Sequence, residues 1–199
     1  MKFLFIIVIA YVLGSVNFSI IIFKFLGRDD PRLSFSGNAG TTNVYRLAGP
    51  AWAAAVLILD VGRAVLVALI AVYALTPGQV PWAGLALVIG NRYPCFHGFQ
   101  GGKGVANYLG FSAVITPAGA AVSALAWVAV YLLKREPFIA SFAMILALAA
   151  GTIIVENFHP WAIAGTLAAV LFIIYNHRKN FIEYKKNKEK SAEVKQEED

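Results

Sequence analysis

A glycine-rich segment with one lysine, Gly101-Gly102-Lys103-Gly104, directly precedes an apolar stretch in the middle of the chain. Glycines let the backbone approach an anion closely, and such a turn aims free N–H groups and the positive end of a helix dipole at it. The segment is not a Walker A loop, because only three residues separate Gly98 from Gly102 and Gly104 replaces the magnesium-binding Ser or Thr. We predict a phosphate site without ATP hydrolysis. Flexible glycine packing is the alternative, but it would not require the lysine.

Residues 34–46, with the sequence SFSGNAGTTNVYR, form a second donor-rich segment. Its hydroxyl and amide groups can donate hydrogen bonds, and Arg46 can bind a phosphate through its planar guanidinium. A polar connector with helix-capping residues is the simpler alternative, although a connector seldom needs so many donors together with an arginine. The candidate substrate-binding residues in this segment are Ser36, Gly37, Asn38, Gly40, Thr41 and Asn43.

A third cluster, the sequence NHRKN at residues 176–180, follows the last apolar stretch. Alone it says little, because basic residues commonly end membrane helices at the lipid headgroups. It gains weight if all three clusters lie on the same membrane face, where they would build a site for one or two phosphates that opens sideways to lipid. The residues gathered there would include Arg46, Lys103, His177 and Arg178.

The net charge of +6 narrows the class of partner. Basic residues next to apolar segments favour an anionic lipid surface or a phosphorylated substrate. Nucleic acid is not expected, because no basic stripe alternates with aromatic residues on a soluble module. His97 and His159 have no Cys or carboxylate partner at metal-ligand spacing, so we expect neither a metal nor a cofactor.

Composition decides the fold class. The chain has 199 residues, of which 59% are hydrophobic and 14% charged, whereas soluble domains have roughly 25% charged residues. A soluble globular enzyme, a disordered protein and a disulfide scaffold are therefore excluded, and Cys95 has no second cysteine to pair with. We predict an all-α integral membrane protein with a single polytopic membrane domain, residues 1–180, and a polar, partly disordered cytoplasmic tail, residues 181–199.

Hydropathy predicts about seven membrane helices of roughly 20 residues each. The apolar runs are Phe3–Phe25, Leu47–Leu75, Pro81–Phe96, Val105–Leu133, Pro137–Val155 and Trp161–Tyr175. We divide the fourth run into Val105–Ile115 and Pro117–Leu133, because Pro117 removes a backbone donor and disfavours helix in the residue before it. Val105–Ile115 is short for a full crossing and could instead be tilted or re-entrant.

The charges fit this division. With an external N-terminus, one side carries Lys24, Arg28, Arg32, Arg46, Arg92, Lys103, Lys134, Arg135 and the tail. The opposite side carries Thr76–Val80, Thr116–Gly119 and Glu156–Pro160, and its only basic residue is Lys2. Cytoplasmic loops carry the excess of Lys and Arg, so all three polar clusters are predicted to be cytoplasmic.

Asp60 and Arg63 lie three residues apart inside the second apolar run, on one helical face. A charge at the bilayer centre costs at least ~2.5 kcal/mol. One interpretation is that residues 47–59 lie partly along the cytoplasmic interface, which would put Arg63 near a helix start. The other is an ion pair that locks two helices together.

The three clusters resemble the motifs of the acyl-phosphate:glycerol-3-phosphate acyltransferase family of bacterial membranes (PlsY). SGNAGTTNVYR is similar to the family's SGNxGxTNxxR, FHGFQGGKGVAN to FxxFxGGKGVAT, and HRKN followed by Glu189 to HRxN…GxE. Other residues that fit are Gly14, Ser15, Asp60, Arg63 and Ser141. The departures are Asn91, Asn107 and Asn187, where the family usually has His, Thr and Gly.

The resemblance implies a membrane enzyme that moves a fatty acyl group from acyl-phosphate to the sn-1 hydroxyl of glycerol 3-phosphate. The products would be 1-acyl-glycerol 3-phosphate (lysophosphatidic acid) and phosphate, in the first step of bacterial phospholipid synthesis. It further implies a location in the bacterial cytoplasmic (inner) membrane, and we expect a monomer. One rival reading is a transporter of an organic phosphate, but transporters usually place their site near the midplane between repeated halves, whereas the chain has no convincing internal repeat and its basic glycine motifs lie at one membrane face. The other is a lipid-binding scaffold, which would explain the basic helix ends but not GGKG or SGNxGxTN.

Residue roles follow from the family's chemistry, in which the protein positions two anions and stabilises a developing oxyanion. The residues assigned to the acyl-phosphate head are Gly101, Gly102, Lys103 and Gly104. Those assigned to glycerol 3-phosphate are Ser36, Arg46, His177 and Asn180, while Asn38, Thr41, Asn43 and Ser141 would shape the loop or donate to the oxyanion. The expected catalytic set is Lys103, Arg46, His177 and Asn180. Because Arg178 and Lys179 disfavour a protonated His177, we expect a substrate phosphate oxygen to accept the proton.

Overall fold

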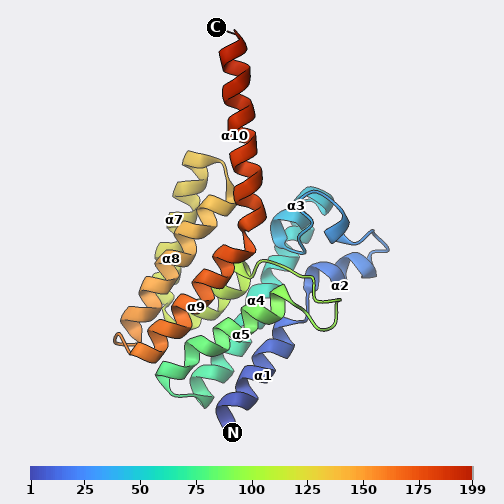
Figure 1. Cartoon of the computed structure of the whole chain (residues 1–199). Coiled ribbons are helices and arrows are strands. Elements are labelled where there is room, and N and C mark those ends of the chain that lie inside the picture. The colour runs from blue at the N-terminus through green and yellow to red at the C-terminus, as the bar shows by residue number, and fades with distance from the viewer. Residues whose placement is uncertain (199) are drawn as a thin grey trace.

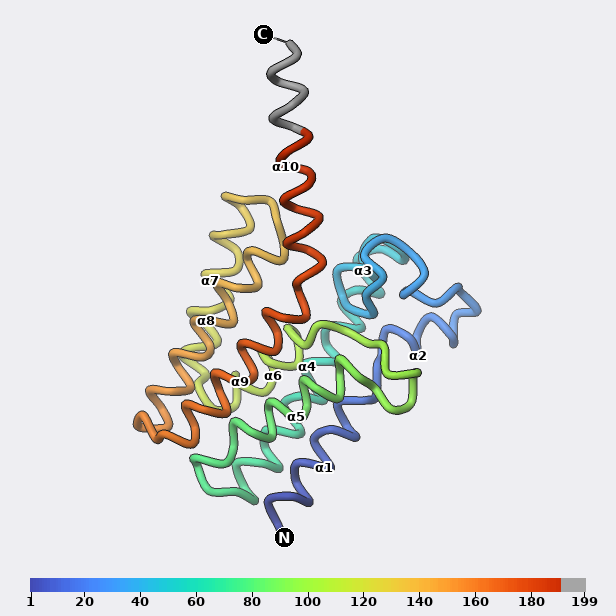
Figure 2. The backbone as a smooth tube through the Cα atoms, in the orientation of Figure 1, coloured from blue at the N-terminus to red at the C-terminus, as the bar shows by residue number. Residues whose placement is uncertain are grey.

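The computed structural model describes the backbone of residues 1–198 and the side chains of residues 1–190 (Figures 1 and 2). Residues 1–198 form helices and connections without a β-strand. The elements are α1 (Lys2–Gly14), α2 (Phe18–Phe25), η1 (Pro31–Leu33), α3 (Thr41–Ala48), α4 (Pro50–Ala74), η2 (Pro77–Gln79), α5 (Val80–Arg92), α6 (Val105–Ile115), α7 (Pro117–Lys134), α8 (Pro137–Val155), α9 (Pro160–Asn176) and α10 (Arg178–Glu198).

Proline and polar caps explain where the helices begin. The first helical residue of α4, α7, α8 and α9 is a proline, whose fixed φ suits the start of a helix and whose missing N–H has no partner there anyway. Thr116 accepts a hydrogen bond from the backbone of Gly119 and so ends α6 and caps α7. The predicted division of the fourth apolar run at this threonine is therefore confirmed.

Four segments are long and apolar enough to cross a membrane, namely Lys2–Phe25, Pro50–Ala74, Pro117–Lys134 and Pro137–Val155. A fifth results if α9 and the described part of α10 count as one span despite the 47° bend between them. The helix α6 has 11 residues, fewer than the ~20 of a straight crossing. The all-α membrane fold is confirmed, whereas the count of seven crossings stays a prediction.

The first two apolar runs are not continuous helices. Residues 15–17 interrupt the first, and Asn17 caps α2 by accepting a hydrogen bond from the backbone of Ile20. Gly49, with φ of +85°, separates α3 from α4 in the second.

The interpretation that places Arg63 near a helix start is wrong. α4 runs unbroken from Pro50 to Ala74, so Arg63 lies in its middle, where it is 7% exposed. Arg63 needs no interfacial position because Asp60 pairs with it at 2.9 Å and Asn107 of α6 accepts a hydrogen bond from it at 2.6 Å. The ion pair thus lies within one helix, and its link to a second helix runs through an amide.

Contacts between connections show which helix ends lie together. Gly78, between α4 and α5, packs against the ring of His159, between α8 and α9. Thr116 lies against Gly151 in the last turns of α8. Figure 2 shows the N-terminus at this end, and α2, α3 and α10 at the opposite end, which we call the loop end. Successive connections between helices thus lie alternately at the N-terminal end and at the loop end of the bundle, as the charge pattern predicts. The compartment that each end faces stays a prediction.

Glycines set the spacing of the helices that carry the loop end. A Cβ on Gly14 of α1 would collide with the backbone of Leu87 in α5, and one on Gly90 with the backbone of Tyr11. Gly110 of α6 packs against the backbone of Val61 in the same way. Such small residues let membrane helices approach closely. As a result, α5 and α6 hold the two ends of the glycine-rich loop at fixed distances from α1 and α4.

On the outer surface of the helix bundle, many large apolar side chains are exposed, for example those of Leu4, Phe5, Tyr73, Leu125 and Leu171. This surface suits lipid rather than water. The polar tail, predicted to be partly disordered, forms helix α10 through Glu198. The boundary between domain and tail at residue 180 stays a prediction.

Candidate active site

The glycine-rich loop and the junction between α9 and α10 are in direct contact. Lys103 donates a hydrogen bond from Nζ to Oδ1 of Asn180 at 2.5 Å, and Nδ2 of Asn176 donates to the carbonyl of Lys103 at 3.3 Å. The second and third polar clusters, which are more than 70 residues apart in sequence, therefore meet at the loop end.

The glycines of this loop are required by their surroundings. Gly101 is packed against the carbonyl of Asn91, and a Cβ on Gly102 would lie 2.6 Å from the side-chain amide of Asn91. Gly104 has φ of +91°, which disfavours other residues. Glycine packing thus explains all three glycines, yet it does not explain Lys103, whose side chain is directed to the junction between α9 and α10.

The two helices that follow the polar clusters begin at the loop end without a side-chain cap: α6, which begins after Gly104, and α3, which begins after Gly40. Their first N–H groups are therefore available to an anion, and the helix dipoles favour negative charge there.

The first polar cluster lies beside the glycine-rich loop. The carbonyl of Ala39 accepts a hydrogen bond from Asn17 at 3.3 Å and would be 3.0 Å from a Cβ on Gly102. Asn43 is 2% exposed and donates to the carbonyls of Pro31 and Ser34. Asn43 consequently shapes the loop, one of the two roles expected for it. The partly buried residues Ser36, Asn38 and Thr41 lie in the turn before α3 and at its start, and Gly37 lies in the same turn.

Positive charge gathers around Lys103. Burial lowers the pKa of its ammonium group to about 8, and the carboxylate of Glu183 opposes this shift. The positive charges of Arg92 and Arg46 lower the pKa of Lys103 as well, which requires both to lie near it. The Arg46 side chain, on α3, is exposed. All three polar clusters thus contribute to one electropositive region.

His177 is neutral near pH 7. Burial lowers its pKa to about 4, the charge of Lys103 acts in the same direction, and a hydrogen bond to the carbonyl of Ile173 opposes the shift. The Nδ1 atom lies 2.8 Å from that carbonyl, so Nδ1 carries the proton and Nε2 is left as a hydrogen-bond acceptor. The ring of Phe142, 5.2 Å away between centroids, packs against the imidazole.

Ser141 does not have the geometry of an oxyanion donor. Its hydroxyl donates to the carbonyl of Pro137, one turn earlier in α8, at 2.8 Å. The hydrogen is thus directed at its own helix.

Several residues that support the site were not among the predicted site residues. Arg32 donates from Nη1 to the carbonyls of His97 at 2.7 Å and Gln100 at 2.9 Å, and its other nitrogens bind Asp30. This hydrogen bonding lowers the pKa of the Asp30 carboxyl. The Asp-x-Arg spacing predicts the local pair, but nothing in the sequence indicates its contact with the loop. Arg92, at the end of α5, is another such residue, because the sequence predicted for it only a place among the basic residues of the cytoplasmic side.

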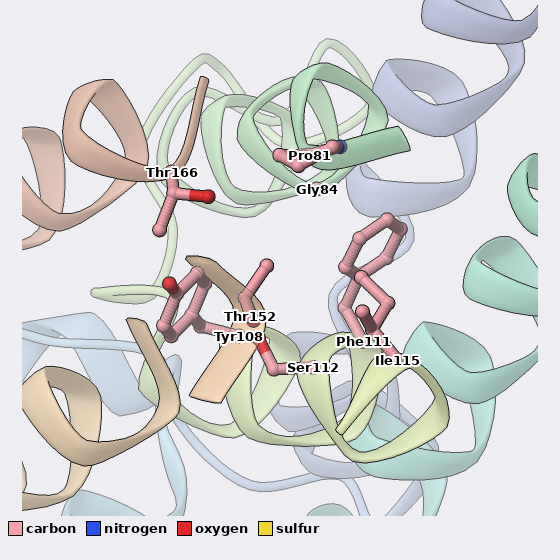
Figure 3. A pocket seen from close by; sticks show the side chains of 8 residues that line it. All are labelled: Pro81, Gly84, Tyr108, Phe111, Ser112, Ile115, Thr152 and Thr166. Carbon is pink, nitrogen blue, oxygen red and sulfur yellow. The ribbon is translucent and has the colours of Figure 1, made fainter. Parts of the chain in front are cut away.

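A small cavity lies elsewhere, between α5, α6, α8 and α9 (Figure 3). Its lining residues are Pro81, Gly84, Tyr108, Phe111, Ser112, Ile115, Thr152 and Thr166. None of them is charged, so the cavity is unsuited to a phosphate. Among the described residues, no group of three or more His, Cys, Asp or Glu side chains could hold a metal ion.

Sequence comparisons identify similar proteins. The family profile described as Glycerol-3-phosphate acyltransferase matches residues 4–187. A protein named glycerol-3-phosphate acyltransferase from Aquifex aeolicus is 38% identical over 190 residues, which cover 90% of this chain and 94% of that protein. One of the same name from Pseudomonas paraeruginosa is 34% identical over 174 residues, covering 87% and 90%.

Two solved structures have a similar fold. One is a crystal structure of PlsY (YgiH), an integral membrane glycerol 3-phosphate acyltransferase, in its glycerol 3-phosphate form, with a TM-score of 0.86, 34% identity and 94% coverage of both chains. The other is its lysophosphatidic acid form, with a TM-score of 0.84, 34% identity and coverage of 94% of this chain and 93% of that one.

Proposed function

This chain belongs to the glycerol-3-phosphate acyltransferase family, and we propose that it transfers a fatty acyl group from an acyl-phosphate to the sn-1 hydroxyl of glycerol 3-phosphate. The products are lysophosphatidic acid and inorganic phosphate. The observation that carries this proposal is the gathering of Lys103, Arg46 and Arg92 around a glycine-rich loop, next to a neutral His177.

The acyl-phosphate head is assigned to the loop from Gly101 to Gly104 and to the start of α6. The uncapped N–H groups of α6 suit its phosphate oxygens, and Lys103 supplies a positive charge for the leaving phosphate. A bound phosphate opposes the effect of burial and raises the pKa of Lys103 above about 8. The acyl chain then extends toward the lipid-facing surface of the bundle.

Glycerol 3-phosphate is assigned to Arg46, Ser36, His177 and Asn180. Arg46 and the uncapped start of α3 suit its phosphate, while Nε2 of His177 accepts a hydrogen bond from a glycerol hydroxyl. The hydrogen bond between Lys103 and Asn180 supports this arrangement, because it puts the proposed binding groups of the two substrates next to each other.

In the proposed step, the sn-1 hydroxyl oxygen forms a bond to the acyl carbon, and the bond between that carbon and the phosphate oxygen breaks. The electron pair and the hydroxyl proton both go to phosphate oxygens. A His177 with a pKa of about 4 is a weak base at pH 7, which favours phosphate as the acceptor. His177→Ala should therefore raise KM for glycerol 3-phosphate; a loss confined to kcat would make His177 the base instead.

We also propose that the loop end faces the cytoplasm in the bacterial inner membrane, because the basic residues of the connections lie there. A monomer suffices for the proposed reaction, since Lys103, Arg46 and His177 all come from one chain.

The proposal is tested with the purified protein in detergent or lipid cubic phase, given palmitoyl phosphate and glycerol 3-phosphate. Lysophosphatidic acid and phosphate should form in equal amounts, and omission of glycerol 3-phosphate should stop both. Palmitoyl-coenzyme A in place of palmitoyl phosphate tests the choice of donor. A transporter or a lipid-binding scaffold would form no lysophosphatidic acid at all.

A further inference from the structure

A buried arginine that the proposed reaction does not use lies beneath the glycine-rich loop. Arg63, in the middle of α4, donates from Nη2 to Oδ1 of Asp60 at 2.9 Å, to Oδ1 of Asn107 at 2.6 Å and to Oδ1 of Asn91 at 3.4 Å. Its guanidinium carbon also lies 5.3 Å from the centre of the Phe18 ring. A charge buried this deeply, at 7% exposure, is costly and calls for a reason.

The two amide partners of Arg63 lie at opposite ends of the loop. Asn91 is in the last turn of α5 (Val80–Arg92), and Asn107 is in the first turn of α6 (Val105–Ile115). Between them run residues 93–104, which include Lys103. One guanidinium group thus contacts both ends of the segment that carries the proposed phosphate-binding groups.

Asn91 is in direct contact with the glycines of the loop. Its carbonyl accepts a hydrogen bond from the backbone N–H of Gly102 at 2.9 Å. Its side-chain amide would be 2.6 Å from a Cβ on Gly102, and its carbonyl blocks a Cβ on Gly101. A shift of Asn91 must therefore move Gly101 and Gly102 as well.

We propose that Arg63 is a positioning residue, which ties α5 to α6 at the base of the loop and so sets the place of Gly101, Gly102 and Lys103. The proposal rests on the proposed function for its kinetic consequences, but not for its structural ones. Asp60 orients the guanidinium and balances its charge.

Arginine suits this position better than lysine. All three hydrogen bonds of Arg63 come from Nη2, at the tip of the side chain, whereas Nε and Nη1 are buried without a partner among the described residues. A lysine ammonium keeps the charge, but its Nζ ends one covalent bond short of the position of Nη2, so it cannot hold all three acceptors from the same place. Arg63→Lys is therefore the informative substitution, since it preserves the pair with Asp60 and weakens the ties to Asn91 and Asn107.

The kinetic experiment compares wild type with Arg63→Lys for each substrate separately. We expect kcat/KM for palmitoyl phosphate to fall about tenfold or more, because misplaced binding groups lose rate steeply, while KM for glycerol 3-phosphate changes little. Thr166→Val, which alters a buried polar residue of the cavity in Figure 3, is the matched control and should behave as wild type. Equal losses for both substrates in Arg63→Lys would overturn the proposal.

A structural readout needs no activity. Cys95, the single cysteine of the chain, is exposed and lies in the loop, so a nitroxide attached to it reports the loop's mobility by electron paramagnetic resonance. Arg63→Lys should increase that mobility, and Thr166→Val should not. Unchanged mobility in Arg63→Lys would refute the positioning role. If wild type made no lysophosphatidic acid, the proposed function would fail, and this measurement would still decide the role of Arg63.

Two further variants test the proposal if Arg63→Lys fails to fold. Asn91→Ala and Asn107→Ala each release one end of the loop and leave Arg63 paired with Asp60. Each should show the same selective loss with palmitoyl phosphate. Combining either with Arg63→Lys should add little, because residues of one network are not additive. Full additivity would mean that the three residues act separately and would contradict the proposal.

Discussion

Two polar regions of this bundle differ in the charge of the side chains that they bring together. At the loop end, Lys103, Arg46 and Arg92 gather near a neutral His177, and hydrogen bonds join elements far apart in sequence. In the other region, between α5, α6, α8 and α9, hydroxyl-bearing residues line one side of a cavity and Phe111 and Ile115 the other (Figure 3).

The comparison separates shape from charge. The cavity is hollow and buried but neutral, and among the described residues the hydroxyls of Thr152 and Thr166 have no hydrogen-bond partner. The loop end offers cations and free N–H groups, which two phosphate-bearing substrates require. Convergence of charge, rather than the presence of a hollow, therefore marks the candidate active site.

The largest expected effect tests the charged region directly. Lys103→Met should lower kcat with palmitoyl phosphate by about 10²–10³-fold, the range seen when one group that stabilises transition-state charge is removed. The measurement is the rate of lysophosphatidic acid formation. Lys134→Met, at the same end but exposed, is the control and should keep near-normal rates. A Lys103→Met enzyme as fast as the control would remove Lys103 from the site.

Arg46 should have a smaller effect, on one substrate. Arg46→Lys keeps the charge but loses the planar fork, so kcat/KM for glycerol 3-phosphate should fall by about 10–100-fold, as expected for a lost charged hydrogen bond. The loss should be mainly in KM. Arg135→Lys, also exposed, serves as the control. A change confined to palmitoyl phosphate would mean that the two phosphate assignments are reversed.

The dependence on pH sharpens the assignment of Lys103. Its pKa is lowered to about 8, and only the charged form attracts an anion, so activity is lost as the pH rises through this value. We expect kcat/KM for palmitoyl phosphate to fall about tenfold per pH unit above it. A bound phosphate raises the pKa, so kcat should decline only at higher pH. Lys103→Arg should remove the decline in activity at alkaline pH. If the decline persists in this variant, a group other than Lys103 causes it.

The smallest effect is expected in the neutral region. Thr166→Val replaces a buried hydroxyl that has no partner among the described residues, and such a group costs about 1–3 kcal/mol. The melting temperature should therefore rise slightly, while the rate with both substrates stays as in wild type. A large loss of activity would show that the cavity takes part in the reaction, and the contrast between the two regions would fail.

A site residue could be predicted from the sequence where it stands in a short motif, but not where its role depends on contacts with distant segments. Lys103, Arg46, His177 and Asn180 were predicted because they stand in short motifs, and the structure gathers their segments at the loop end. The role of Asn43 as a loop support follows from its burial, and the hydrogen bond of Ser141 to Pro137 was not predictable from its position in a motif. Arg32 and Arg63 were missed as supports of the glycine-rich loop, since the partners through which they hold it lie 28 to 68 residues away in sequence.

By itself, the sequence determined the membrane class, the family and the break before Pro117. These depend on hydropathy, motifs and proline chemistry, which are properties of single residues and their near neighbours. Only the tertiary structure decided that Arg63 lies in the middle of α4 under the glycine-rich loop, and that Lys103 contacts Asn180. Such contacts depend on how whole helices pack, and close packing at glycines such as Gly14 and Gly90 sets distances that no local pattern contains.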